Sequence, residues 1–469
     1  MATTTATPKS GFYVEVTCPG CGSALNLESD FFVLRCDHCS SVHRVILPEV
    51  PSAFLIPAGI ERREARFSID RYLKQQGLPL TGSGMHLKQL YYPYWKVDAI
   101  LFRLRNKVYE KVVMEEGEYN DAVTVSHDRT EISLSPYTTT RAAGVPFEGI
   151  PASIGMRTEY IKMVPFAREN VQEEFDSFPV LSSWEDVRSA LLMNVGVISD
   201  IDLSDIGSNV TELFHPKASL VYFPYLVMES YSQGGFNRYV VDGVSGRVLD
   251  HVTAVDSESQ FEYPEAPTVE FGALTVEHHR CPTCGVDLPA RQSYVYICRN
   301  CHELIVLCHN REVVSELHAA VVSEKNQDPM FPFWSLRVPE DRVAQLQKMF
   351  GGIHRSDRLI IPAFKSQNFD ALFRLTKRMS AAIPQLELES LDKLDDRFLP
   401  VTVSPDEATM MTEVIIYRQG FSGERKTASE PAAFVPEDIG LVYVPFHPEH
   451  YFYVDSIMNV ITFEKSLAR

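Results

Sequence analysis

Eight of the nine cysteines fall into two matched quartets, and this spacing restricts the possible folds more than any other feature of the chain. Each quartet reads C-x2-C, a gap of 14 or 13 residues, and C-x2-C, and each opens on a Cys-Pro-x-Cys-Gly knuckle. Four thiolates paired in this way can close a tetrahedral zinc site that has no open ligand position. The predicted ligands are Cys18, Cys21, Cys36 and Cys39 in the first quartet and Cys281, Cys284, Cys298 and Cys301 in the second.

Other uses of these cysteines fit the pattern less well than zinc does. Disulfide scaffolds are small and cysteine-dense, whereas a long stretch without cysteine separates the two quartets here. A redox pair needs a reactive thiol at a helix start, but residues 31–34 and 294–297 are typical of strands leading into the second knuckle. Iron in a rubredoxin-like cage remains the lesser alternative to two structural Zn²⁺ ions. For Cys308, the ninth cysteine, we favour a buried free thiol over a spare ligand.

Composition indicates a globular protein with more than one domain. The chain has 469 residues, of which 45% are hydrophobic, so the bodies outside the quartets can build cores of their own. There is no run of 18 apolar residues, and residues 1–10 lack a charged-then-apolar signal pattern. We therefore expect a cytoplasmic protein with a short disordered lead and no membrane span.

The formal charge of −18 argues against nucleic acid as a partner, because binding to phosphates depends on displaced counterions. Two predicted helices carry basic residues, and we interpret both as solvated faces. The many aromatic residues alternate with Pro, Val, Asp and Glu rather than with Lys or Arg, so core packing is expected instead of base stacking. The basic residues are Arg62, Arg63, Arg66, Arg71 and Lys74 on one helix and Lys365, Arg374, Lys377 and Arg378 near the other.

The segments that follow the two quartets resemble each other. Residues 91–95 and 330–334 both read aromatic-Pro-aromatic-Trp, and each leads into residues that alternate between apolar and polar. This alternation predicts a strand with one buried face, and proline suits the beginning or the edge of such a strand. A weaker match joins residues 55–58 with 360–363, although residues 163–166 could also be the partner of the latter.

A second matched pair lies near the end of each half. Residues 220–225 correspond to 441–446, and Tyr239-Val-Val-Asp-Gly corresponds to Phe452-Tyr-Val-Asp-Ser. The Asp-Gly in the first half predicts a hairpin turn, and the second half, which lacks the glycine, requires a different turn. Helices are predicted around 65–73 ended by Gly77, over 184–195 after a Ser182/Glu185 capping box, from Pro339 to Gly351, and over 368–379; loops are predicted at 116–130, 201–217, 253–268 and 384–410.

These patterns predict an α+β fold in which two β-hairpin zinc ribbons are each followed by an antiparallel sheet with helices, arranged as a diverged tandem duplication. The expected domains are a lead at 1–10, zinc ribbon 1 at 11–48, body 1 at 49–256, a linker at 257–274, zinc ribbon 2 at 275–310 and a shorter, diverged body 2 at 311–469.

No motif identifies a reaction. His447-Pro-Glu-His450 could offer two imidazoles, but its proline opposes a helical face, and a polar turn is the better interpretation. Residues 81–84 contain glycines without the Lys-Ser/Thr of a phosphate-binding loop, and no nucleophile elbow or HExxH occurs. The run His278-His279-Arg280 is expected to be exposed. We therefore predict no catalytic and no further cofactor residues, and an enzyme is the less favoured class.

The combination of motifs resembles a bacterial family. A Cys-Pro-x-Cys-Gly ribbon, an Ile-Pro strand, a helix, a Tyr-x-Pro-Tyr-Trp strand and a closing Phe-Pro-Tyr…Val-Val-Asp-Gly hairpin are similar to uncharacterised bacterial zinc-ribbon proteins, often labelled by analogy with primosomal helicase ribbons. The resemblance covers residues 12–252 and, in abbreviated form, 275–465. It implies that the eight quartet cysteines bind metal, and it implies no activity.

The sequence therefore favours a structural or protein-interaction module whose two zinc ribbons and exposed strand edges contact protein partners. A nucleic-acid-associated ribbon protein is the first alternative, and it would need a continuous basic stripe. An enzyme with an active site in a cleft between a ribbon and its body is the second alternative.

Overall fold

The computed structural model has a mixed α+β fold that consists mostly of sheets with few helices. It divides into two compact units, which we describe separately. Unit 1 comprises 1–101, 136–203 and 211–277, and unit 2 comprises 102–135, 204–210 and 278–469. The residues described are 12–28, 32–46, 50–78, 85–114, 122–155, 161–166, 176–177, 180–184, 186–187, 189–191, 210–232, 235–254, 272, 274–307, 314–321, 327–349, 357–366, 368–383, 386–420 and 436–468.

The strand β10 (Val210–Ser232) organises the main sheet of unit 1. It pairs in parallel with β5 (Ser52–Leu55) and antiparallel with β11 (Gly235–Asp242), which continues antiparallel into β12 (Val248–Ala254). Beyond β5, the sheet extends through β8 (Ile161–Pro165) to the first ribbon.

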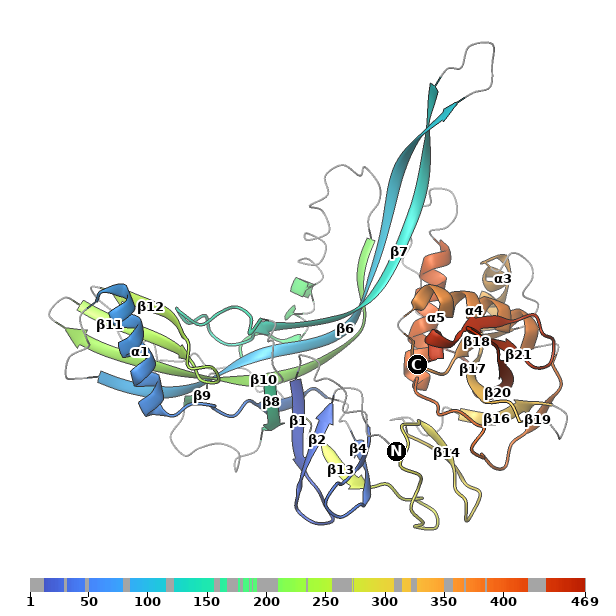
Figure 1. Ribbon diagram of the computed structural model, residues 1–469, viewed down its shortest axis with the longest axis horizontal. Helices are drawn as coiled ribbons and strands as arrows, with labels where there is room; N and C mark the ends of the chain where they lie inside the picture. Colours follow the sequence, from blue (N-terminus) through green and yellow to red (C-terminus); the bar gives the residue numbers. More distant parts are fainter. Residues whose placement is uncertain are drawn as a thin grey trace. The chain divides into compact units, whose positions relative to one another are not determined.

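A long hairpin branches from this sheet. The strand β6 (Met85–Met114) pairs with β10, with β7 (Ala122–Ala142) and with the short β9 (Asp176–Ser177), and the hairpin of β6 and β7 is visible in Figure 1. The loop predicted at 116–130 is therefore wrong from residue 122 onward, and β10 likewise begins inside the loop predicted at 201–217. Pairing between strands overrides the acidic and polar composition that suggested loops.

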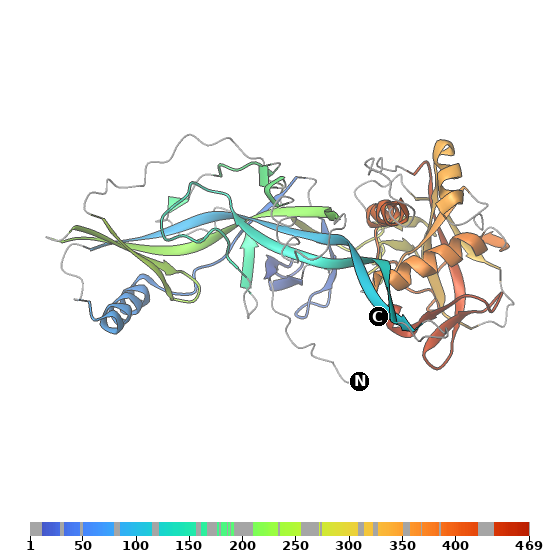
Figure 2. The ribbon, with the colours of Figure 1, turned by 90° about the horizontal axis from the view of Figure 1, so that it is seen from above.

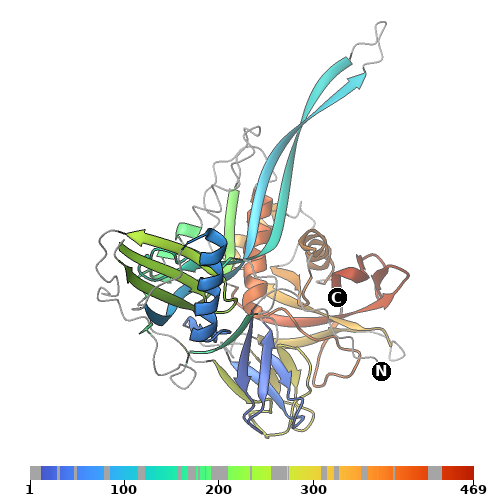
Figure 3. The ribbon, with the colours of Figure 1, turned by 60° about the vertical axis from the view of Figure 1, so that its left-hand side comes forward.

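Helix α1 (Arg62–Gln76) confirms the helix predicted before Gly77. Its buried residues Ala65, Ile69 and Leu73 recur at helical spacing and pack on apolar side chains of β10 and β11. Gly77 ends the helix in the left-handed conformation, with φ 68°, which glycine adopts without strain. Figure 2 and Figure 3 show the helix along one face of the sheet.

The aromatic-Pro-aromatic segment of unit 1 is buried on both faces, which corrects the one-faced strand expected from alternation. Tyr91 and Trp95 belong to one hydrophobic cluster, whereas Tyr92 and Tyr94 belong to another. Pro93 accordingly lies inside β6 and not at its beginning. These aromatic side chains form the core, as predicted, and are not free to stack on bases.

Unit 2 is built on a seven-stranded sheet around β17 (Met330–Arg337) and β20 (Ile439–Pro448), which pair antiparallel. The strand β16 (Val314–Ala320) runs parallel to β20 and lies between it and β19. The remaining elements of the unit are β18 (Arg358–Pro362), β19 (Leu388–Ser390), β21 (Phe452–Asp455), β22 (Thr462–Glu464), α3 (Glu340–Met349), α4 (Phe369–Ala382), α5 (Pro405–Gly420) and the 3₁₀ turn η3 (Lys465–Ala468).

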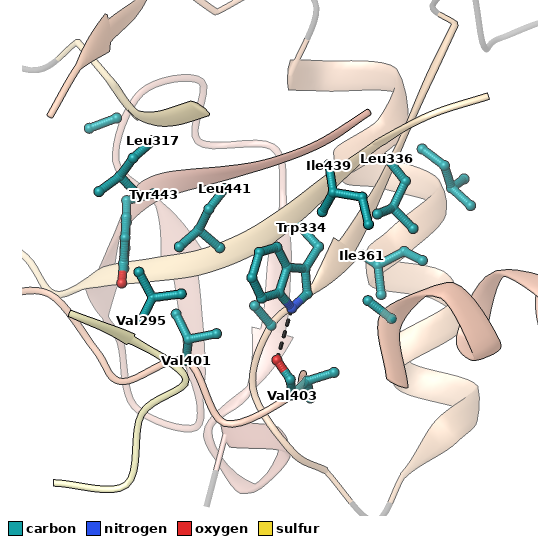
Figure 4. Close-up of a cluster of buried hydrophobic side chains, with 14 of the residues drawn as sticks. Val295, Leu317, Trp334, Leu336, Ile361, Val401, Val403, Ile439, Leu441 and Tyr443 are labelled. Atoms are coloured by element: carbon teal, nitrogen blue, oxygen red, sulfur yellow. Dashed lines mark hydrogen bonds between the residues drawn. The ribbon is translucent and has the colours of Figure 1, made fainter. Parts of the chain in front are cut away.

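Trp334 lies at the centre of the unit 2 core. Figure 4 shows it among aliphatic side chains from β16, β17, β18 and β20, with its indole N–H donating to the Val403 carbonyl at 2.9 Å. On the opposite face of β17, Phe331 and Phe333 belong to a second cluster that includes residues of α4. Trp334, Leu336 and Val338 share one buried face, as the alternation predicts, but the opposite face is also buried at Phe331 and Phe333, contrary to the one-faced prediction. Pro332 lies within this strand.

The starts of three helices can be compared with the predicted ones. The helix α4 begins after Asn368, whose side chain accepts from the Ala371 amide, close to the predicted start. The predicted Ser182/Glu185 box is wrong by one residue, because Ser183 and Asp186 exchange the two capping hydrogen bonds. Helix α5 begins inside the loop predicted at 384–410 and continues to residue 420, so that prediction is wrong from residue 405 onward. A capping box of Ser404 and Glu407 marks its start.

Candidate metal centres

The first quartet is held by the turns of two hairpins. The strands β1 (Phe12–Thr17) and β2 (Ala24–Glu28) flank the knuckle of Cys18 and Cys21, and β3 (Val33–Arg35) and β4 (Val42–Ile46) flank that of Cys36 and Cys39. In each knuckle a residue at positive φ closes the turn by donating its N–H to the first cysteine carbonyl, Gly22 at 2.9 Å and Ser40 at 2.8 Å. The turn geometry brings the two thiols of each C-x2-C pair to one side.

The second quartet repeats this backbone arrangement. Gly285 donates to the Cys281 carbonyl at 2.9 Å, and His302 donates to the Cys298 carbonyl at 3.0 Å, both with positive φ. The second knuckle is flanked by the predicted strand segment, here β14 (Val295–Ile297), and by β15 (Leu304–Val306), which pair antiparallel.

In each quartet the four sulfur atoms converge on one point. Within a quartet every Sγ lies within 4.8 Å of the others. The Sγ separations between the two knuckles are 3.7 Å for Cys18–Cys39 and Cys21–Cys36. In the second quartet they are 3.6 Å for Cys281–Cys301 and 3.5 Å for Cys284–Cys298.

These separations fit a shared metal ion. Zn–S bonds of about 2.3 Å in a tetrahedron place sulfur atoms about 3.8 Å apart, close to the observed spacing. A disulfide would need about 2.05 Å, and these eight cysteines are free thiols. Two Cys₄ sites compatible with zinc ribbons are therefore present, and either could bind a metal ion through four thiolates.

Each quartet has two buried and two outer sulfurs. Cys18, Cys36, Cys281 and Cys298 are buried, Cys21 and Cys39 are exposed, and Cys284 and Cys301 are half-buried. Hydrogen bonds favour the thiolate form at several of them. The Ser23 hydroxyl lowers the pKa of Cys36 to about 6, and the Ser41 hydroxyl lowers the pKa of Cys39. The Val286 amide and then the Asn300 side chain lower the pKa of Cys284 to about 6.

A Cys₄ shell can stabilise a fold but does not activate water, because four protein ligands leave no position for a solvent molecule. The residues in each shell come from two hairpin turns, and few apolar residues lie between those turns. Metal binding would therefore supply much of the folding free energy of such a ribbon, on the order of 10–16 kcal/mol in comparable sites.

The strand β13 (Thr275–His278), from the segment expected to begin ribbon 2, pairs with β4 of the first ribbon. A salt bridge of 3.0 Å between Arg44 and Glu277 accompanies this pairing. Figure 1 shows β13 beside β4, so the first ribbon gains a strand from a distant part of the chain. Most of the linker expected at 257–274 lies outside the described residues.

The remaining sequence candidates do not form a site among the described residues. His447 contacts Glu449 at 3.5 Å and His450 packs on Tyr451, and neither belongs to a cluster of metal ligands. His279, expected to be exposed, is buried against Tyr296 with ring centroids 4.8 Å apart. Cys308 and residues 81–84 lie outside the described residues.

No helix in the described part of the chain has the length and apolar character to cross a membrane. Comparison of the chain with family models, with curated proteins and with solved structures finds no match.

Proposed function

We propose that the chain is a cytoplasmic zinc-binding scaffold or adaptor of the bacterial zinc-ribbon type that it resembles. Two structural Zn²⁺ ions would hold the ribbons, and the bodies would contact protein partners. The observation that carries the proposal is the closed sulfur shell, in which four Sγ atoms lie within 4.8 Å of one another in each quartet. Such a shell stabilises a binding surface and leaves no ligand position for substrate.

We further propose that the two halves descend from a tandem duplication. Matched hydrogen bonds support this relation. The Trp95 indole donates to the Ser182 carbonyl at 3.0 Å and the Trp334 indole to Val403 at 2.9 Å. In both cases the accepting residue directly precedes the serine of a capping box.

The end of each half supports the same relation. In both units a turn residue donates its N–H to the proline of the central strand, Gly243 to Pro224 at 2.9 Å and Ser456 to Pro445 at 3.0 Å. Each of these turns follows a buried aspartate whose carboxylate accepts backbone N–H groups. The weak match of residues 55–58 to 360–363 receives no such support. Residue 55 ends β5, which runs parallel to the central strand β10, whereas residues 360–362 belong to β18. In unit 2 the strand parallel to the central strand β20 is β16.

An edge strand of unit 2 offers a surface for a protein partner. The strand β19 pairs with β16 at the end of the sheet order, and all three of its residues are exposed. The Glu387 carbonyl accepts from Val321, just after β16, and the Leu391 amide donates to Leu317 of β16. The alternate residues Leu388 and Ser390 therefore direct their backbone groups away from the sheet. An extended peptide could add to this edge.

The test is isolation of the chain at native expression, with zinc quantified in the same sample. The proposal expects two zinc ions per chain and a stoichiometric protein partner. Ser390→Pro removes one outward N–H and should release a partner bound at β19, whereas Ser390→Ala should retain it. Absence of metal, or nucleic acid in place of protein, would overturn the proposal.

One observation favours the nucleic-acid alternative. The basic residues of α1 are all exposed, and Phe67 between them is 57% exposed, with the Arg63 guanidinium 5.7 Å from its ring centroid. A flat aromatic ring beside cations suits an unpaired base and its phosphates. Binding of a single-stranded oligonucleotide that weakens steeply with salt, and weakens further in Phe67→Ala, would support this role; salt-independent or undetectable binding would exclude it.

A further inference from the structure

Two hydroxyl groups contact the sulfur atoms of the first quartet. The Ser23 Oγ lies 3.1 Å from the Sγ of both Cys21 and Cys36. The Ser41 Oγ lies 2.8 Å from the Sγ of Cys39. A metal-bound thiolate can only accept hydrogen bonds, so each hydroxyl must donate its proton to sulfur.

A buried histidine extends this network. The His43 Nε2 lies 2.7 Å from the Ser41 Oγ and 3.2 Å from the Cys18 Sγ, and the side chain is fully buried. Because Ser41 gives its only proton to Cys39, it must accept from His43, which places a hydrogen on Nε2. The same N–H also faces Cys18, and the single Ser23 proton is shared between Cys21 and Cys36, so three side-chain hydrogens lie within reach of the four sulfurs.

Within the described residues, the second quartet has no equivalent of the Ser23, Ser41 and His43 side chains. At the positions with the same spacing from the cysteines, the side chains have no hydrogen to donate to sulfur, since two are aliphatic and one is a carboxylate. Among the described contacts, the Asn300 amide is a side-chain donor that reaches Cys284. The residues that correspond to Ser23, Ser41 and His43 are Val286, Glu303 and Ile305.

We propose that the two metal centres differ in reactivity, and that the second is a modification site for soft electrophiles while the first is shielded. This inference rests on the proposed zinc binding. Four thiolates around one Zn²⁺ carry a net charge of −2, and each donated hydrogen bond withdraws electron density from a sulfur nucleophile. The thiolates of the second quartet retain more of that density.

The reaction with a maleimide illustrates the difference. The thiolate sulfur adds to one alkene carbon, and the neighbouring carbon takes a proton from water, which is left as hydroxide. The product is a neutral thioether, which is a poorer zinc ligand than a thiolate, so successive additions within a quartet would weaken its hold on Zn²⁺. Cys284 and Cys301 are the half-buried sulfurs through which a reagent would enter the second centre.

Accessibility alone predicts that the first quartet reacts faster than the second. Cys21 and Cys39 are exposed, whereas Cys284 and Cys301 are only half-buried. A test of reactivity therefore separates shielding by hydrogen bonds from shielding by burial. Loss of metal from the second centre would also destabilise body 2, because Val295 and Ile297 of β14 pack in the core of that body.

The experiment treats the zinc-loaded full chain with N-ethylmaleimide, follows released zinc with a chromogenic chelator, and maps adducts by peptide mass spectrometry. We expect Cys284 and Cys301 to react about tenfold faster than Cys21 and Cys39. Equal rates, or faster reaction of the first quartet, would overturn the inference. A chain that carries no zinc would instead overturn the proposed function, so the two failures are distinguishable.

Exchanged residues provide the controls. Val286 is 41% exposed, and Val286→Ser places a hydroxyl at the position that Ser23 occupies in the first ribbon. We expect this variant to slow modification of the second quartet, whereas Val286→Ala, which changes only bulk, should not. Ser41→Ala should accelerate modification of Cys39 several-fold. If Val286→Ser and Val286→Ala behave alike, hydrogen bonding does not set the rate and the inference is wrong.

Discussion

The two ribbons have the same pair of C-x2-C knuckles, with gaps of 14 and 13 residues, but are joined to their bodies in different ways. The first has a small core of its own, in which Val16, Leu25 and Leu27 pack with its buried cysteines. Its apolar contact with the core of body 1 runs through the partly buried Val14 and Leu274. Parallel pairing of β1 with β8 adds a backbone connection.

The second ribbon shares its core with body 2. Alternate residues of β14 are buried on opposite faces, with Tyr296 against the buried cysteines and Val295 and Ile297 in the cluster of Trp334. The Ser293 hydroxyl also accepts from the Val401 amide at 3.1 Å. One cysteine motif can thus serve as an appended module or as part of a domain core, depending on whether its strands have one apolar face or two.

Removal of metal should distinguish the two attachments most strongly. We expect Cys281→Ser/Cys298→Ser to unfold ribbon 2 and to withdraw Val295 and Ile297 from the core of body 2. Each buried aliphatic side chain contributes about 1.5–3 kcal/mol, so unit 2 should lose about 3–6 kcal/mol of stability. Hydrogen exchange measured by peptide should show faster exchange in β17 and β20.

The matched control is Cys18→Ser/Cys36→Ser. Because the first ribbon has its own core, exchange should increase in β1 to β4 while β10 and β11 stay protected. Equal loosening of both bodies would contradict the difference between the two attachments.

The paired tryptophans give the next largest effect. Trp334→Phe leaves the buried Val403 carbonyl without its donor and opens space within the surrounding hydrophobic cluster, so we expect a loss of about 3 kcal/mol in unit 2. Trp95→Phe should cost about 2 kcal/mol, because the partly exposed Ser182 can bind water instead. Denaturant unfolding measures both losses, and a larger loss for Trp95→Phe would contradict this account.

The buried turn aspartates should differ as well. Asp455 accepts four backbone N–H groups, those of Met458, Asn459, Val460 and Ile461, whereas Asp242 accepts those of Val244 and Ser245. Hydrogen bonds to a charged acceptor contribute about 1.5–3 kcal/mol, and those to one carboxylate overlap. We expect Asp455→Ala to cost about 2.5 kcal/mol and Asp242→Ala about 1.5 kcal/mol in the same unfolding measurement. The reverse order would show that turn length, not the count of donors, sets the cost.

The sequence predicts those features of the fold that depend on a few neighbouring residues, such as metal knuckles, helix ends and turns. Cysteine spacing predicted both quartets, Gly77 predicted the end of α1, and the missing glycine predicted a different second turn, in which Asn459 supplies the positive φ. The apolar neighbours of Trp95 and Trp334 predicted that both side chains are buried. They did not predict that both faces of the two strands are buried.

The rest depends on contacts between distant residues. Pairing of β1 with β8, or of β5 with β10, leaves no mark in either segment alone. The pairing of β13 with the first ribbon likewise could not be predicted, because the two segments are far apart in the sequence. The donors around the first quartet do have a signal in the sequence. Ser23, Ser41 and His43 stand at alternating positions after the knuckles, a pattern that turns the side chains of a strand toward one face.

The two capping boxes should produce the smallest difference. Ser183 and Asp186 in unit 1 and Ser404 and Glu407 in unit 2 each exchange two hydrogen bonds at a helix start. We expect Ser404→Ala and Ser183→Ala each to cost about 1 kcal/mol, and replacement by glycine to cost less. Ser404 directly follows Val403, whose carbonyl accepts from Trp334. In the double variant, Ser404→Ala should therefore reduce the free energy of unfolding by less than it does alone. A double-mutant cycle measures this coupling, and strict additivity would mean that the cap and the core are independent.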